Sequence, residues 1–181
     1  MINVLTMTPE DWERVRVLRL AALADSPDVF SSTLAREEAF DEEAWRKRLS
    51  GSTQFKAEAG HRDLWLDMPA PNQAVTFIAE SGGDDVGMAT VLVVDEPGTA
   101  LVVGVWVSPS ARGQGVAPRL FEEMIAWARD QGLTRVTLDV GDANTSAQKL
   151  YANLGFLPTG KKGSLPEPRT HILEHELELR L

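Results

Sequence analysis

Residues 107–118 read VSPSARGQGVAP and join two runs of very different pattern. The preceding run, ALVVGVWV (100–107), is apolar throughout and predicts a strand buried on both faces. In the following run, 117–131, apolar residues recur at helical spacing. Glycines at a strand-to-helix turn let backbone N–H groups approach an anion, and the helix N-terminus adds about half a positive charge. The stretch predicts a diphosphate site, although an unliganded glycine turn can look the same.

A second informative stretch follows at 138–156, LDVGDANTSAQKLYANLGF. It completes a predicted strand, 135–140, and continues into a predicted helix. Asn144 is a candidate N-cap for that helix, and Gly155 is typical of a helix end. The two stretches together predict a β-α-β crossover, which requires parallel strands.

The remaining chain predicts further strands and helices on both sides of this crossover. A long loop without clean periodicity is expected over 51–72, with Phe55, Trp65 and Leu66 packed against the body. The predicted elements are strand 2–7, helices 9–24 and 41–49, a meander of strands 74–80, 86–94 and 100–107, a strand starting at 156, and an alternating last strand 171–180. The order β-α-α-β-β-β-α-β-α-β-β predicts an α/β protein with a mixed sheet and helices on both faces.

Composition narrows the classes of function. A chain of 181 residues is expected to form one domain, 1–181. Lys and Arg number 18 against 27 Asp and Glu, a net charge of −9 that disfavours nucleic-acid binding. With no cysteine there is no disulfide, thiolate zinc site or acyl-cysteine intermediate. No apolar run reaches membrane-spanning length and the first residues lack signal-peptide character, so we expect a cytoplasmic protein without a membrane partner.

Two other motifs are weaker. Gly113-x-Gly115-x-x-Pro118 partly matches the dinucleotide-binding fingerprint, with Asp139 as a ribose-binding acid, but the third glycine is missing and too little chain follows. His171-Ile-Leu-Glu174-His175 matches a zinc-protease pattern, but that pattern needs a helix and this segment alternates as a strand. We therefore expect no metal site.

Taken together, the two stretches resemble the signatures of the GNAT acetyltransferase superfamily. Arg112-x-x-Gly115-x-Ala117 is similar to the family's acetyl-CoA signature, and Asn144-x-x-Ala147-x-x-Leu-Tyr151 to its second segment. The resemblance implies a GNAT-like fold whose central sheet splays apart, and acetyl-CoA as co-substrate. It also implies that a backbone cradle binds the CoA diphosphate, at Arg112, Gly113, Gln114, Gly115, Val116 and Ala117.

Further cofactor contacts carry over by position. In the family, the strand before the cradle bulges, and its backbone pairs with the pantetheine arm; here Val105 and Val107 would supply those groups, with Gly104 easing the bulge. Asn144 would either contact pantetheine or cap its helix, and the small Ala147 would let the cofactor pass. Pro118 departs from the family pattern and removes one N–H donor.

The resemblance also assigns the catalytic groups. Tyr151 would be the general acid that returns a proton to the leaving thiolate. The family's frequent base, a Glu early in the preceding strand, is replaced by Leu101. Asp139 is the candidate base, with Glu80 or a water relay as alternatives. Without cysteine, the acetyl group is expected to move directly within a ternary complex.

The acceptor is expected to be a primary amine on a small molecule or a peptide. The acid-rich segment 25–43 would attract a cationic amine, unless it is merely a solvated surface. A homodimer is possible if the last strand pairs with a second copy. The missing glutamate at Leu101 supports one alternative, a non-catalytic acyl-CoA-binding or regulatory domain.

Overall fold

The computed structural model describes residues 1–50, 53–58, 61–67 and 74–181. Its centre is a seven-stranded sheet in the order β1-β4-β5-β6-β7-β9-β8. Every neighbouring pair is antiparallel except β6 and β7, the two strands joined by the predicted crossover. The strands are β1 (Ile2–Thr6), β4 (Ala74–Ser81), β5 (Asp84–Val93), β6 (Thr99–Val107), β7 (Arg135–Gly141), β8 (Leu157–Ser164) and β9 (Leu173–Arg180).

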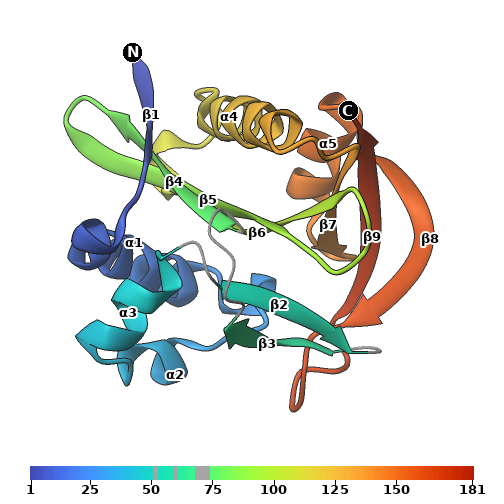
Figure 1. The fold of residues 1–181 in the computed structure, drawn as a ribbon, viewed down its shortest axis with the longest axis horizontal. Helices are drawn as coiled ribbons and strands as arrows, with labels where there is room; N and C mark the ends of the chain where they lie inside the picture. Colours follow the sequence, from blue (N-terminus) through green and yellow to red (C-terminus); the bar gives the residue numbers. More distant parts are fainter. Residues whose placement is uncertain (51–52, 59–60, 68–73) are drawn as a thin grey trace.

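Helices cover both faces of this sheet, as predicted (Figure 1). One face carries α4 (Val116–Asp130) and α5 (Thr145–Asn153), and the other carries α1 (Trp12–Asp25), α2 (Leu34–Glu38) and α3 (Glu42–Arg48). Short 3-10 turns precede several of them: η1 (Pro9–Asp11), η2 (Pro27–Val29) and η3 (Pro109–Ala111). The two faces have separate apolar cores, which we call the α4 core and the α1 core.

The sheet splays at its centre. β6 and β7 pair only from Thr99↔Arg135 to Leu101↔Thr137, whereas β6 stays paired with β5 as far as Val107. The register of β5 and β6 shifts between Met88 and Thr90, and Gly104 lies in the resulting bulge with a φ of 65°. Both the splay and the bulge predicted for this strand are confirmed. Beyond Val102, every residue of β6 except Trp106 is only partly buried, which corrects the expectation of a strand buried on both faces throughout.

The expected loop over 51–72 is wrong. Its described residues form an antiparallel pair, β2 (Thr53–Glu58) and β3 (His61–Asp67). The register of this pair shifts between Lys56 and Glu58, and such a shift breaks the alternation by which a strand is recognised in sequence. The pair lies on the same side of the sheet as α1–α3 (Figure 1). The expected packing of Phe55, Trp65 and Leu66 lies outside what the structure describes.

Two smaller expectations also change. The five-residue helix α2 was not predicted; its N-cap is Thr33, whose hydroxyl accepts a hydrogen bond from the Arg36 N–H (3.3 Å). The last strand, β9, lies inside the sheet between β7 and β8, so its backbone edges are used within the chain. The basis for expecting a homodimer through this strand is therefore absent.

Candidate active site

The predicted diphosphate cradle lies at the N-terminus of α4. Gly113 and Gly115 have φ values of 75° and 84°, and Gly115 is the N-cap residue. A Cβ at either glycine would meet no atom within 4 Å, so the backbone conformation, and not crowding, requires glycine here. The first-turn N–H groups of Val116 and Ala117 have no intrahelical acceptor, and this turn contains no acidic residue. These donors fit an anion such as a diphosphate.

The side chains of the cradle hold the loop in place. Arg112 donates from Nε to the Val107 carbonyl (3.0 Å) and forms an ion pair with Asp25 at the end of α1. Gln114 donates to the Ser110 carbonyl (2.8 Å). Hydrogen bonds from Ser26 and Trp106, together with Arg112, lower the pKa of Asp25, which therefore remains a carboxylate. The backbone of the cradle is thus left as its binding surface.

The splayed strand leads from this cradle towards the centre of the sheet. Val105 lies in the bulge, Val107 follows it, and both pack against the α4 core. Within the described part of the chain, β6 has no strand partner on the β7 side beyond Leu101. An extended ligand could pair with this edge of β6, and the role of Val105 and Val107 in such pairing stays a prediction.

Tyr151 lies on α5, in the α4 core. It is 7% exposed, and its ring packs against Phe121 and Phe156 at centroid distances of 5.6 and 6.0 Å. Burial raises the pKa of the Tyr151 hydroxyl well above its usual value of 10. The hydroxyl therefore remains protonated across the physiological range. Of the two roles considered for Asn144, the structure shows the cap: its side chain accepts from the Ala147 N–H (3.2 Å).

Asp139 lies on β7, on the opposite face of the sheet from Tyr151. Its neighbours Leu138 and Val140 belong to the α4 core, so the alternation of the strand directs Asp139 towards α1–α3. Directly across from it on β9 is Glu176, 4% exposed, which approaches the Lys161 ammonium at 3.3 Å. The sequence analysis missed Glu176, although its place on the polar face of an alternating strand could have identified it.

The alternative base, Glu80, has a structural partner. Its carboxylate accepts from Arg14 Nη2 (3.1 Å), and the same guanidinium pairs with Asp85. This ion pair links α1 to the β4–β5 turn. Of the two carboxylates considered, Asp139 is the one that lies beside the splay between β6 and β7.

Several acidic side chains of segment 25–43 have partners within the protein and are not free to attract a cationic acceptor. Glu37 is 1% exposed and accepts hydrogen bonds from Arg19 (2.8 Å) and Arg48 (2.8 Å). Asp25 is paired with Arg112, and Asp41 caps α3 by accepting from the Ala44 N–H (2.9 Å). The interpretation of Glu37 as a steering charge is therefore wrong, because its carboxylate is buried and already paired.

The His-x-x-Glu-His match also has a structural explanation. Leu173–Arg180 is a strand, so His171 and His175 do not share a helical face. His175 Nε2 lies 2.6 Å from an Asp142 carboxylate oxygen at the end of β7.

None of the described helices is long and apolar enough to cross a membrane.

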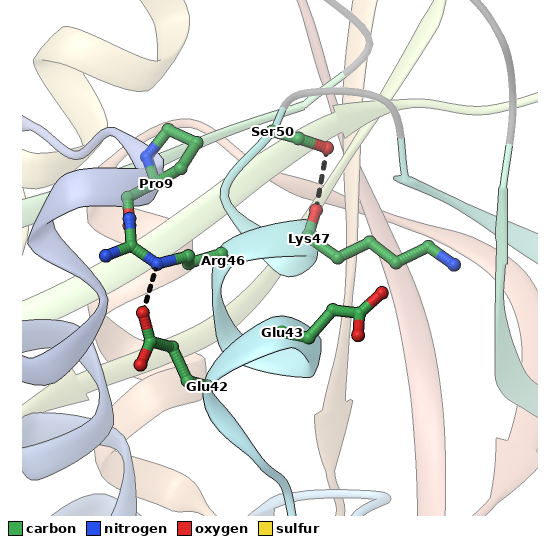
Figure 2. A pocket seen from close by; sticks show the side chains of 6 residues that line it. All are labelled: Pro9, Glu42, Glu43, Arg46, Lys47 and Ser50. Atoms are coloured by element: carbon green, nitrogen blue, oxygen red, sulfur yellow. Dashed lines mark hydrogen bonds and ion pairs between the residues drawn. The ribbon is translucent and has the colours of Figure 1, made fainter.

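A hollow of about 600 Å³ lies between η1 and α3, away from the predicted site residues. Figure 2 shows the side chains that line it: Pro9, Glu42, Glu43, Arg46, Lys47 and Ser50. Arg46 is held there by Glu42 (2.7 Å) and by the Pro9 carbonyl (3.1 Å). The bond to Pro9 links α3 to η1.

The structure thus combines a glycine cradle at a helix N-terminus with a splayed mixed sheet. The family model described as the acetyltransferase (GNAT) family matches residues 37–156, and the chain belongs to this family. Solved structures agree over the whole chain. A GNAT acetyltransferase from Streptococcus pneumoniae has a TM-score of 0.75 at 18% identity, covering 100% of this chain and 99% of that one. A ribosomal-protein-alanine N-acetyltransferase from Brucella melitensis has a TM-score of 0.73 at 18% identity, and the match covers 99% of each of the two chains.

Curated relatives match over a shorter region. Rat N-acetyltransferase family 8 member 2 is 41% identical over 88 residues, which is 46% of this chain and 39% of the relative. Human N-acetyltransferase 8 is 37% identical over 89 residues, which is 47% of this chain and 39% of the relative. The match thus spans about two fifths of the length of these relatives.

Proposed function

We propose that this chain is an acetyl-CoA-dependent N-acetyltransferase that transfers the acetyl group directly to a primary amine. The observation that carries the proposal is the juxtaposition of the α4 cradle with the splay between β6 and β7. Membership of the GNAT family supports it. Acetyl-CoA supplies the acetyl group as a thioester, activated for attack by an amine.

The cradle and the splayed strand would bind and orient the co-substrate. Backbone N–H groups from Gly113 to Ala117 would bind the diphosphate, with one donor fewer because of Pro118. The edge of β6 at Val105 and Val107 would hold the extended arm. Ala147 lies at the start of α5, and its small side chain would leave room for the cofactor to pass over this helix.

Protons would move at two residues on opposite faces of β7. A protonated amine, with a pKa near ~10, must lose a proton before it attacks, and Asp139 would accept that proton. Tyr151 would return a proton to the departing thiolate, whose thiol has a pKa near ~8.5. Because burial raises the pKa of Tyr151, the hydroxyl is in the donating form at neutral pH.

The alternative, a non-catalytic acyl-CoA-binding domain, rests on Leu101 in place of the family's glutamate. Release of free CoA thiol from acetyl-CoA, measured across a panel of primary amines, separates the two functions. Amine-dependent release that Asp139→Asn strongly lowers supports the transferase. Tight CoA binding with no release for any amine supports the binding domain.

A further inference from the structure

A buried arginine lies against the bulge of β6, on the face of the sheet opposite Tyr151. Arg19 is on α1, four residues after Val15 and three before Ala22, so helical spacing places it among the apolar residues of the α1 core. It is 5% exposed, and its guanidinium carbon lies 4.6 Å from the centroid of the Phe30 ring. A charged side chain buried in this way requires partners.

Part of this guanidinium is paired. Nε donates to both oxygens of Glu37 (3.2 and 3.0 Å), and Nη2 donates to one of them (2.8 Å). The third nitrogen, Nη1, is buried and has no hydrogen-bond partner among the residues that the structure describes. It lies 3.6 Å from the position that a Cβ on Gly104 would occupy. Nearly all buried N–H groups in proteins are satisfied, so this donor points to a ligand.

Because Nη1 lies near Gly104, that ligand would lie beside the splay between β6 and β7. Gly104 lies in the β6 bulge, just beyond the point where β6 and β7 separate. Tyr151 lies with α4 and α5 on the opposite face, whereas Asp139, the candidate base, faces the side of α1–α3, so we expect the acceptor amine on that side. On this face the sheet thus offers a carboxylate for an amine and a guanidinium N–H for an anion.

We infer that the acceptor carries a carboxylate in addition to its amine, and that Arg19 Nη1 binds this carboxylate. The inference rests on the proposed transferase function and defines its substrate class as amino acids. Arg19 is then a residue that determines specificity, held in position by Glu37. Because the carboxylate is bound in the ground state as well as during reaction, its loss acts mainly on KM.

The test measures kcat/KM for α-, β- and γ-amino acids and for their primary carboxamides. Each kcat/KM is calculated from the concentration of acceptor that is present as the free amine. This correction removes the effect of the amide on the amine pKa. The best amino acid should exceed its amide by about tenfold or more, as expected for a hydrogen bond to a charged group. Arg19→Lys, which keeps a charge for Glu37, should remove most of this preference through KM. Arg14→Lys, on the same helix but paired with Asp85 and Glu80, should retain it.

Three results would overturn the inference. Equal use of acids and amides by the unmodified protein would mean that Nη1 binds only water. An equal loss of kcat for every amine in Arg19→Lys would place Nη1 on the acetyl carbonyl instead. In both cases the transferase function stands, whereas an absence of acetylation for all amines overturns the function and the inference together. The comparison in the unmodified protein decides the matter even if Arg19→Lys fails to fold.

Discussion

The residue that most constrains the cradle is Gly115, because it joins η3 to α4 in a left-handed conformation. Gly115→Glu would strain this backbone and place a carboxylate beside the proposed diphosphate. We expect CoA affinity to fall by roughly tenfold or more, measured by calorimetric titration.

A matched control lies at the other end of the same helix. Gly132 has a φ of 71°, and a Cβ there would also meet no atom within 4 Å. Gly132→Glu therefore imposes a similar backbone strain without approaching the cradle. If both variants weaken CoA binding equally, the cradle is not the binding site.

At Tyr151, the hydroxyl can be removed without disturbing the packing. The ring of Tyr151→Phe can keep its contacts with Phe121 and Phe156, so the thermal midpoint should change little. We expect kcat to fall by roughly 10²–10⁴, the range for loss of a general acid, with CoA affinity unchanged. Full turnover in the variant would make Tyr151 a packing residue only.

At the scale of elements, α1, α2 and α3 are joined by the buried ion pairs of Glu37 with Arg19 and Arg48. Burial alone would raise the pKa of Glu37, but the hydrogen bond from Arg19 and the charges of both arginines lower it to about 2. A lowered folded-state pKa stabilises the fold above the ordinary pKa of 4.5, and this contribution is lost as the pH falls towards 2.

Protonation of Glu37 should accordingly lower the free energy of unfolding by about 3 kcal/mol between pH 5 and pH 2. Glu37→Gln should lose a similar amount at neutral pH and show a weaker acid dependence, measured by urea unfolding. Glu38→Gln, at the exposed next position, should behave as the unmodified protein. An acid dependence that is identical in all three proteins would contradict the assignment.

These helices also show which elements can be predicted from sequence. Capping residues and helical spacing identified α1, α3 and α5 closely, because those signals are local. The Arg19–Glu37 ion pair joins residues 18 positions apart on different helices, and nothing local connects them. A charged residue on the apolar face of a predicted helix was the available signal, and it was not used.

For the whole molecule, the splay and the cradle were predictable because a short motif specifies both the turn and the helix that follows. The β2–β3 pair could not be predicted from the sequence, because its register shift hides the alternation of its strands. The face of the sheet to which each site residue belongs also needed the structure. Only the strand register shows that Tyr151 and Asp139 lie on opposite sides of β7, and that Glu176 lies beside Asp139.

This arrangement predicts the pH dependence of the complete reaction. The acceptor reacts as a free amine, which is scarce at pH 7 when its pKa is near ~10. At saturating acetyl-CoA, kcat/KM for the acceptor should therefore rise from neutral pH to about 9. The raised pKa of Tyr151 moves the loss of the general acid to higher pH still, so no decline is expected within this range.

Two measurements check the two limbs separately. An acceptor amine of lower pKa should shift the rising limb to lower pH by the same amount, since that limb belongs to the amine. Tyr151 is the only tyrosine of the chain, so absorbance reports its ionisation directly, and this should begin only above its ordinary pKa of about 10. A tyrosine that ionises below pH 10, together with a kcat/KM that declines over the same interval, would show a hydroxyl more exposed to solvent than its burial in the α4 core implies.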